Sequence, residues 1–329
     1  MDLTIIIPTY NRKELLEITT KHLLDCFEPF SNFKFQIIIS DNASLESPRF
    51  IIEKIADDRI TFLENKNNLG ITRNILNASK LAKGKFMWIF GDDDLVDFEA
   101  IKKIVSLIKN EDTFEFLQIG VKSFKYEEDI NWKENGNKVN ICPLNLMSDL
   151  KRIDSNFGFI SSNIFLANIF FSVSEKVFNR NPKLLNNNYW VKLINYEIYK
   201  ISTKKITIND ELIYQRITQA SSFYKSPEVI FKTFFEDLNE ILNYHKLYNT
   251  EFLITRKIYF KKKIDLIIIK LFHQSSFNRV FKILQYSNSL DFYILFILFT
   301  PKIILKKMYL FYKKIKGDEL PYIYKINEV

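Results

Sequence analysis

Short apolar runs alternate with amphipathic stretches over the first 120 residues of the chain. The apolar runs lack the polar alternation of half-exposed strands, which is typical of strands covered on both faces. Strands are predicted over residues 4–7, 36–40, 60–63 and 86–90, and helices over 12–27, 47–56, 71–81 and 97–109. This strand–helix rhythm predicts an α/β fold with a Rossmann-like, mostly parallel, doubly wound sheet and flanking helices.

The rest of the chain is less regular. Residues 121–150 are polar and predict loops, whereas the long apolar stretch 157–171 predicts a strand, a helix or both. A helix is predicted over 184–201, a final strand over 206–214 and an amphipathic helix over 228–249.

Positive charge is concentrated in the last quarter of the chain. Residues 251–329 contain 15 Lys and Arg but 6 Asp and Glu, which leaves 32 of the 47 basic and 33 of the 39 acidic residues for the remainder. This asymmetry indicates two domains: a sheet-containing domain over residues 1–225, and a basic, apolar and mainly helical extension over 226–329.

The composition of this extension bears on its partner. Aliphatic and aromatic residues interleave with Lys, unlike a solvated phosphate-binding face, so we expect no nucleic acid. The longest run without charge, Phe292–Pro301, has ten residues, whereas a spanning helix needs about 20. Lys-rich amphipathic helices suit the membrane interface, so we expect peripheral membrane contact. The alternative is an ordinary helical subdomain with solvated Lys side chains.

Cysteine and histidine content limits the chemistry. The two cysteines and three histidines are scattered, without the spacing of a zinc site or of a disulfide framework. The apolar run at the N-terminus is too short for a signal peptide and ends at Pro8. We therefore expect a reduced, cytoplasmic setting.

Polar groups gather where a doubly wound sheet binds its ligands, outside the carboxyl ends of the strands. They are Pro8-Thr9-Tyr10 after the first strand, Asp41-Asn42 after the second, Asn68-Leu69-Gly70 before the helix that carries Arg73, and Gly91-Asp92-Asp93-Asp94 after the fourth. Because parallel strands end at the same edge of a sheet, the four groups together outline one site.

Asp92, Asp93 and Asp94 give the strongest chemical signal. Three adjacent carboxylates repel one another, and a cation relieves that repulsion. Mg²⁺ and Mn²⁺ prefer carboxylate oxygens and are often shared with substrate phosphates. A metal ion here would neutralise a diphosphate leaving group. The alternative is a helix N-cap, which explains one aspartate but not three.

The other polar groups have two interpretations each. Asp41 and Asn42 hydrogen-bond a nucleobase or ribose, or they form only an Asx turn, which taken alone is the better interpretation. Arg73 reaches a phosphate, or it is a surface residue of its helix. Tyr10 stacks on a base or fills the sheet edge. The residues alone leave these alternatives open.

Four sequence blocks resemble a known family. They are IIIPTYNR (5–12), IIISDNAS (37–44), NNLGITRN (67–74) and KGKFMWIFGDDDL (83–95). In this order they are similar to the family-2 glycosyltransferases of the GT-A fold, and within it to the abequosyltransferase-like O-antigen enzymes. The resemblance implies that Pro8, Thr9 and Tyr10 line the nucleobase pocket, that Asp41 binds the base, and that Arg73 lies near the nucleotide.

The same resemblance makes the aspartates the family's metal motif, with one departure. Many relatives read Asp-x-Asp-Asp, and alignment on the following Leu puts Gly91 where their first Asp stands. Asp93 then falls on the metal-binding position, whereas a frame shifted by one uses Asp92 and Asp94. We expect Asp93 first, and we keep all three as candidate metal-binding and catalytic residues, with Asp92 also a candidate donor ligand.

The catalytic base has no clear counterpart. Inverting relatives often carry an acidic pair after the 157–171 region, but the nearest match here is Asn187-Asn188, which cannot accept a proton. Asp154 and Glu197 are the nearest carboxylates in sequence, each more readily explained as structural. The base is therefore unassigned, and a retaining mechanism stays open. A weaker match covers residues 209–216 and Ser221-Ser222, which resemble the late strand and R-x-H-x-x-S segment of the family, with Thr218 in place of the His.

The sequence thus predicts a glycosyltransferase that moves a sugar from a nucleoside-diphosphate-sugar to a saccharide acceptor, with Mn²⁺ or Mg²⁺ as cofactor. The extension suggests a lipid-linked acceptor at the inner face of the cell membrane, in O-antigen, capsule or lipooligosaccharide synthesis. Two alternatives stay open. One is a nucleotide-sugar- or lipid-binding protein without turnover. The other is a nucleotidyltransferase, for which PTYNRKE lacks the expected Gly-rich phosphate loop.

Overall fold

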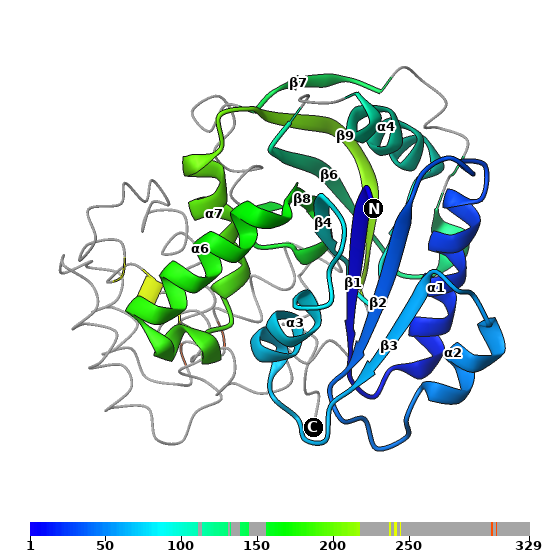
Figure 1. The fold of residues 1–329 in the computed structure, drawn as a ribbon, viewed down its shortest axis with the longest axis horizontal. Coiled ribbons are helices and arrows are strands. Elements are labelled where there is room, and N and C mark those ends of the chain that lie inside the picture. Colours follow the sequence, from blue (N-terminus) through cyan, green and yellow to red (C-terminus); the bar gives the residue numbers. More distant parts are fainter. Residues whose placement is uncertain are drawn as a thin grey trace. The chain divides into compact units, whose positions relative to one another are not determined.

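The computed structural model describes residues 1–110, 114–130, 132, 139–144 and 156–217, and single positions at 237, 240, 241, 244, 304 and 307. The chain divides into two compact units, residues 1–218 and 219–329. The strands and helices below belong to the first unit (Figure 1). The helix predicted over 228–249 and the basic stretch within 251–329 lie outside the continuously described residues, so the extension stays a prediction.

Four parallel strands form the first half of the sheet. They are β1 (Leu3–Thr9), β2 (Phe35–Asp41), β3 (Ile60–Glu64) and β4 (Phe86–Ile89), in the order β3-β2-β1-β4. All residues of β1, β2 and β4 are buried, as their unbroken apolar runs predicted. The strand order reverses between β1 and β4, which is where an open α/β sheet opens a ligand crevice.

Helices cover both faces of this half. The helices α1 (Lys13–Phe27), α2 (Arg49–Ile55) and α4 (Phe98–Lys109) lie on one side, and α3 (Ile71–Ser79) lies on the other (Figure 1). Their apolar faces pack on the strands, as the helical spacing of apolar residues in these segments predicted. The predicted alternation is confirmed, with element ends within about two residues of those expected.

The second half of the sheet is mixed. The strands β6 (Phe116–Phe124), β8 (Asn163–Leu166) and β9 (Lys205–Arg216) continue from β4, with the short β5 (Leu95–Val96) and β7 (Ile141–Pro143) paired to β9. Here β8 runs antiparallel to β4 and β6, whereas β6 and β9 are parallel. The doubly wound parallel pattern therefore holds for the first half only.

The loop prediction for residues 121–150 was wrong in part, and the helix predicted over 184–201 begins at Trp190. Residues 121–150 were predicted as loops, but 121–124 form the end of β6 and 141–143 form β7. The end of β6 reads as polar because Lys122 and Ser123 are exposed, so this part of the strand lacks the apolar pattern of a buried one.

The stretch 157–171 contains both elements that its composition allowed. β8 leads directly into the helix α6 (Ala167–Arg180), which is followed by a 3₁₀ turn at Pro182–Asn186 and by the helix α7 (Trp190–Ile201). Figure 1 shows α6 and α7 on the side of the sheet that carries α3. This arrangement brings the 182–186 turn close to α3. Among the described residues, no helix is long and apolar enough to cross a membrane.

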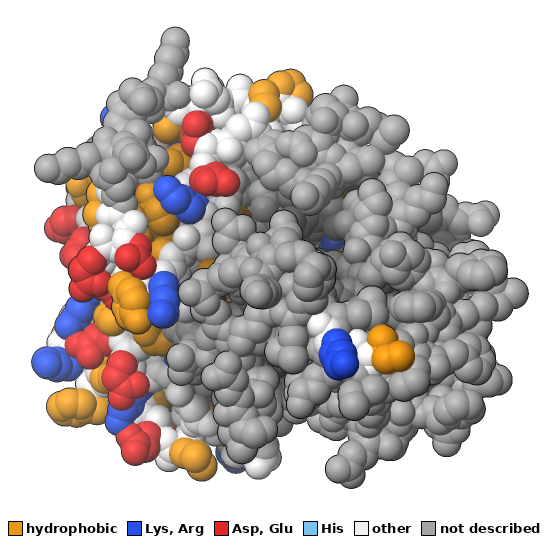
Figure 2. Space-filling view, turned by 180° about the vertical axis from the view of Figure 1, so that it is seen from behind, with side chains coloured by type: hydrophobic (Ala, Val, Ile, Leu, Met, Phe, Trp, Pro, Cys, Tyr) orange, Lys and Arg blue, Asp and Glu red, His pale blue; other side chains and the backbone are white. Residues whose placement is uncertain are grey.

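The described surface around α1 and α2 carries both charges. Figure 2 shows acidic and basic side chains interspersed on this face. Two of the pairs are Lys21 with Glu17, whose Nζ and Oε1 lie 2.6 Å apart, and Arg49 with Glu64, whose Nη2 and Oε2 lie 2.7 Å apart. Exposed pairs of this kind contribute little to stability. Because both charges are present, this face has neither a uniformly positive nor a uniformly negative electrostatic potential.

Candidate active site

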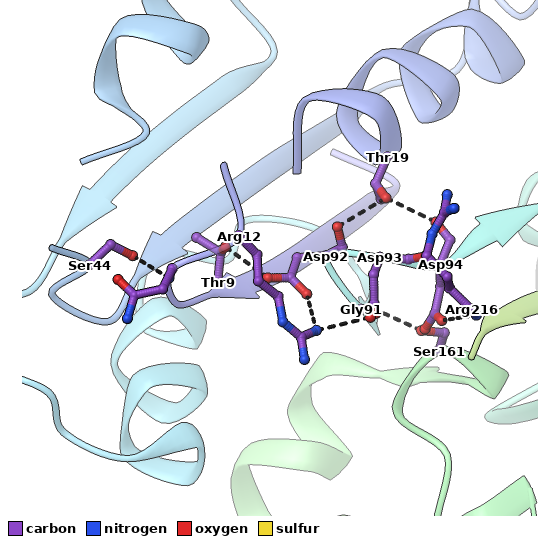
Figure 3. A network of polar contacts seen from close by, with 11 residues as sticks. Thr9, Arg12, Thr19, Ser44, Gly91, Asp92, Asp93, Asp94, Ser161 and Arg216 are labelled. Atoms are coloured by element: carbon purple, nitrogen blue, oxygen red, sulfur yellow. Dashed lines mark hydrogen bonds and ion pairs between the residues drawn. The ribbon is translucent and has the colours of Figure 1, made fainter. Parts of the chain in front are cut away.

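The carboxyl ends of β1 and β4 meet at the point where the strand order reverses. There the hydroxyl of Thr9, the last residue of β1, donates a hydrogen bond of 2.8 Å to Oδ2 of Asp92 (Figure 3). Both side chains are buried. The first and fourth polar groups predicted from the sequence are therefore joined by a direct contact.

Arg12 binds two of the three aspartates. Its Nη1 atom lies 3.1 Å from Oδ1 of Asp92 and 2.9 Å from Oδ2 of Asp93. One nitrogen thus serves both carboxylates, and the two oxygens converge on a single point from adjacent residues (Figure 3). A cation already occupies that point, and it comes from the loop between β1 and α1.

Asp94 turns away from this point. Its Oδ2 accepts a hydrogen bond of 2.6 Å from the hydroxyl of Ser161, and that hydroxyl accepts one of 2.8 Å from the backbone N–H of Gly91. Oδ1 of Asp94 accepts from the backbone N–H of Arg216 at 3.4 Å. A Cβ at position 91 would lie 2.4 Å from Oδ2 of Asp94. Gly91 is therefore needed to give space to a carboxylate of its own loop.

Two further residues hold the backbone of the aspartate loop. The hydroxyl of Thr19, on α1, lies 3.1 Å from the carbonyl oxygens of both Asp92 and Asp94. Nε of Arg216, at the end of β9, donates to the carbonyl oxygen of Asp93 at 3.1 Å. The loop is thus fixed from α1 on one side and from β9 on the other, which presents the carboxylates in a set geometry.

Burial raises the pKa of all three carboxyl groups. For Asp92 it raises the pKa to about 6, against the opposing charge of Arg12. Burial also raises the pKa of Asp93, although Arg12 and Arg216 oppose it. The pKa of Asp94 is raised by burial and by the charge of Asp93. Two arginines face three buried carboxylates here, so a further cation nearby would favour the charged forms of the carboxylates.

The N-cap of α4 is a residue outside the aspartate triplet. The residue that caps α4 is Asp97, whose Oδ1 accepts from the backbone N–H of Glu99 at 2.9 Å. Asp92, Asp93 and Asp94 lie before β5 and make the contacts described above. Helix capping therefore does not account for the three aspartates.

The described residues can offer a metal ion two carboxylates here. Oδ1 of Asp92 and Oδ2 of Asp93 converge within 3.1 Å of one atom. No group of three or more His, Cys, Asp or Glu side chains in a metal-binding arrangement occurs among the described residues. Two carboxylates fit Mg²⁺ or Mn²⁺, since such ions in nucleotide sites take one or two protein carboxylates and complete their shell with phosphate oxygens and water.

Asp41 and Asn42 shape a turn. The two carboxylate oxygens of Asp41 accept from the hydroxyl and the backbone N–H of Ser44, the latter at 3.0 Å. Ser44 in turn accepts from the backbone N–H of Asn11 at 2.7 Å. Asn42 donates to Oδ1 of Asn68 at 2.9 Å. Asp41 thus closes a turn onto Ser44, three residues on, and these contacts tie the ends of β1 and β2 to the 65–70 loop.

The remaining predicted site residues differ in burial and in their contacts. Pro8 is buried in β1, whereas 44% of Tyr10 is exposed. Arg73, on α3, donates from Nη1 to Oδ1 of Asn186 at 2.7 Å. Within the described part of the chain, Arg73 makes no hydrogen bond to the aspartate loop, but it links α3 to the segment that precedes Asn187. The structure therefore joins Thr9 directly to the aspartate loop, and places Arg73 against the neighbouring 182–186 turn.

None of the described candidates for the catalytic base contributes a carboxylate to the hydrogen-bond network of the aspartate loop. Asn187 is buried, and its Oδ1 accepts from the backbone N–H of Tyr189 at 2.8 Å. Glu197 is buried on α7, where burial raises its pKa against the charges of Lys200, Lys176 and Arg180. Asp154 and Thr218 lie outside the described residues.

Four residues of this site were not among the sequence candidates: Arg12, Thr19, Ser161 and Arg216. Arg12 ends the first resemblance block, and Arg216 lies within the weaker late match, so both had a signal in the sequence. Thr19 and Ser161 had none, because a hydroxyl on a helix or in an apolar stretch is uninformative until its tertiary partner is known.

Comparison with known proteins decides the family. Residues 4–170, about half of the chain, match the family described as Glycosyl transferase family 2. The chain belongs to glycosyl transferase family 2. The matched segment contains β1 to β4, the aspartate loop and Ser161, so it spans the whole network apart from Arg216.

Curated relatives match over shorter segments. The abequosyltransferase RfbV of Salmonella typhimurium is 40% identical over 97 residues, which are 29% of this chain and 28% of that protein. A GalNAc(5)-diNAcBac-PP-undecaprenol beta-1,3-glucosyltransferase of Campylobacter jejuni is 33% identical over 28% of this chain and 29% of its own length. The chain thus aligns with less than a third of either relative.

Two longer likenesses extend the comparison. The glycosyltransferase GlyG of Streptococcus pneumoniae is 22% identical over 65% of this chain and 70% of its own. TarS of Staphylococcus aureus, solved as residues 1–349 in complex with UDP-GlcNAc, superposes with a TM-score of 0.52 over 82% of this chain and 80% of that one, at 17% identity. This structural likeness shows the fold, which is GT-A-like as the sequence resemblance implied.

Proposed function

We propose that this protein transfers a sugar from a nucleoside-diphosphate-sugar to a saccharide acceptor, assisted by Mg²⁺ or Mn²⁺. The observation that carries the proposal is the convergence of Oδ1 of Asp92 and Oδ2 of Asp93 on one cationic position at the carboxyl ends of β1 and β4. The family and the crevice position of the site support it.

In this proposal the carboxylates of Asp92 and Asp93 would hold the metal ion. When bound, the ion stabilises the negative charge of the departing nucleoside diphosphate as a Lewis acid. Asp93, with 15% of its side chain exposed, is the more accessible of the pair, and Asp92 is fixed by Thr9. Asp94 is assigned a positioning role, because Ser161 and Arg216 already bind its oxygens.

The loops at neighbouring strand ends would hold the nucleoside. Tyr10 is exposed and offers a ring for the base, beside the turn that Asp41 and Ser44 build. Arg73 would bind a phosphate of the donor with the guanidinium that donates to Asn186 in this structure. The contribution of Pro8, Thr9, Asp41 and Asn42 to nucleoside binding is mainly to shape the pocket.

A lipid-linked saccharide at the inner face of the cell membrane is the proposed acceptor. The basic and apolar composition of residues 251–329 supports it, since each Lys near an anionic surface contributes roughly 1 kcal/mol. The name of one relative points the same way, because it is a glucosyltransferase that acts on an undecaprenol-linked glycan. O-antigen, capsule or lipooligosaccharide assembly is the corresponding process.

A donor panel tests the proposed function. Purified protein is incubated with UDP-, GDP-, CDP- and dTDP-sugars, with Mn²⁺ or with EDTA, and release of the nucleoside diphosphate is measured. One nucleotide class should be hydrolysed with Mn²⁺ and spared with EDTA. Binding of a donor without turnover across a broad acceptor screen would instead favour a non-catalytic sugar-nucleotide-binding protein. Release of pyrophosphate from a nucleoside triphosphate and a sugar phosphate would favour a nucleotidyltransferase.

A further inference from the structure

Arg12 stands in an unusual relation to the aspartate pair. It uses a single nitrogen for Asp92 and Asp93, at 3.1 and 2.9 Å. No other hydrogen bond from its guanidinium to a described residue occurs, so Nε and Nη2 have no partner in the described part of the chain. A purely structural arginine usually spreads its five donors over several acceptors, often as a two-nitrogen fork.

Arg12 is the most exposed member of this ion-pair network. Its side chain is 24% exposed, while the side chains of Asp92 and Asp93 are 7% and 15% exposed. Thr9 donates to the carboxylate of Asp92, and Thr19 and Arg216 hold the backbone of the aspartate loop, whereas the side chain of Arg12 bonds only the two carboxylates among the described residues. It belongs to the loop at the start of α1, next to Asn11, whose φ of 56° lies in the left-handed region. The aspartates are thus the fixed partner and the arginine the displaceable one.

We propose that Arg12 is an internal counter-cation that competes with the divalent metal ion for Asp92 and Asp93. This inference rests on the proposed function, because it concerns the metal position of the same site. Without donor, Nη1 occupies the point where the two carboxylate oxygens converge and relieves their repulsion. Two cations cannot share that point. When the metal arrives with the diphosphate, the guanidinium leaves the pair, and its fork is free to bind a phosphate.

The proposal gives Arg12 two effects of opposite sign. In the nucleotide-free protein it lowers the affinity for a metal ion, since the ion must displace it. With donor present, it adds a phosphate contact and so favours the metal–donor complex. The metal and the nucleotide would then bind together more tightly than either alone, which limits occupation of the site by free metal.

The test measures Mn²⁺ binding to the full chain without nucleotide. The electron paramagnetic resonance signal of free Mn²⁺ reports how much of the ion is unbound. The variant Arg12→Gln removes the competing charge and should bind Mn²⁺ about tenfold more tightly than wild type, within the usual range of coupling between two ligands. Lys13→Gln is the matched control. It removes one positive charge from the next residue, which pairs with Glu46 outside the site, and should leave the affinity unchanged.

Three outcomes would refute the role of Arg12. If Arg12→Gln binds Mn²⁺ as wild type does, or more weakly, the counter-cation role is refuted while the metal site stands. If it binds more tightly but Lys13→Gln does so equally, the effect is general electrostatics and the role is refuted as well. If neither wild type nor Arg12→Gln binds Mn²⁺ even with nucleotide, the metal assignment of the proposed function fails together with the inference.

A second measurement covers the case in which Arg12→Gln does not fold. The side-chain Nε–Hε resonance of Arg12 is assigned in wild type through its loss in Arg12→Lys, and Mg²⁺ is titrated in. The inference predicts that this resonance shifts as the backbone resonances of residues 92–94 shift. A change in the aspartate loop with an unmoved Arg12 resonance would overturn it.

Discussion

The hydroxyl of Ser161 donates a 2.6 Å hydrogen bond to Oδ2 of Asp94 and accepts one from the backbone N–H of Gly91. It therefore joins the aspartate loop to the segment just before β8, across 67 residues of sequence. This contact holds Asp94 away from Asp92 and Asp93 and leaves the latter two to converge. The division of three adjacent aspartates into one positioning residue and a ligand pair depends on it.

The variant Ser161→Ala should lower both stability and metal affinity. It leaves a buried carboxylate and a backbone N–H without their partner, which costs about 1–3 kcal/mol. Loss of a residue that orients metal ligands typically weakens metal binding about tenfold or more. Ser162→Ala is the control, because the hydroxyl of Ser162 is also buried but donates to the carbonyl oxygen of Asn156 at 2.6 Å. Urea unfolding should show a loss for both, and Mn²⁺ titration a loss for Ser161→Ala alone.

The variant Asp93→Asn should lower donor turnover at least about a hundredfold, because a metal ion at the leaving group contributes several kcal/mol to the barrier. The fold should be retained, since Asn has the same shape. Asp97→Asn serves as control: Asn is an equally good N-cap, so α4 and activity should be preserved. Full activity of Asp93→Asn would remove Asp93 from the metal site.

The pH dependence of stability should report on Asp92 in metal-free buffer. Burial raises its pKa to about 6 in the folded protein, against about 3.9 in the unfolded chain. The folded state therefore holds the proton more tightly. Its contribution to stability is full below about pH 4 and is lost as the pH rises through about 6. The loss is about 3 kcal/mol.

The measurement compares wild type with Asp92→Asn by urea unfolding in EDTA. The free energy of unfolding of wild type, minus that of Asp92→Asn, should fall by about 2.5 kcal/mol between pH 4 and pH 7.5. A difference that stays constant or rises with pH would mean that Asp92 is not the desolvated carboxyl described here.

Arg73 offers a test of the donor pocket. The variant Arg73→Ala should raise the KM for the donor by about tenfold or more, the usual value of a hydrogen bond to a charged group. Asn186→Ala removes the internal partner of Arg73, which lies at 2.7 Å, and keeps the guanidinium. Its donor KM should change less than threefold, by a rough estimate on the same basis. A rise in the acceptor KM alone for Arg73→Ala would place Arg73 in the acceptor site instead.

Much of the first half of the fold could be predicted from sequence. Strands such as β1 and β2 are buried on both faces, so local composition alone identifies them. The second half could not be, because its strands pair over long distances: β6 lies between β8 and β9, and the exposed end of β6 has no apolar signature. Local patterns do not specify such pairings.

The location of the site could be predicted from the sequence, but the directions of its side chains could not. The ends of β1 and β4 put Thr9 and Asp92 at one edge, as topology requires. The direction of each aspartate depends on Arg12, Ser161 and Arg216, of which the last two lie far along the chain. Adjacent identical residues give no sign of which will face a ligand, so the sequence could only name all three.

The most direct measurement is a crystal structure with Mn²⁺ and the nucleoside diphosphate that the donor panel identifies, using anomalous scattering to locate manganese. The account predicts one manganese about 2 Å from carboxylate oxygens of Asp92 and Asp93 and from a diphosphate oxygen, with Arg12 withdrawn from the pair. Nucleotide bound without manganese, or carboxylates still paired to Arg12 with the ion elsewhere, would contradict it.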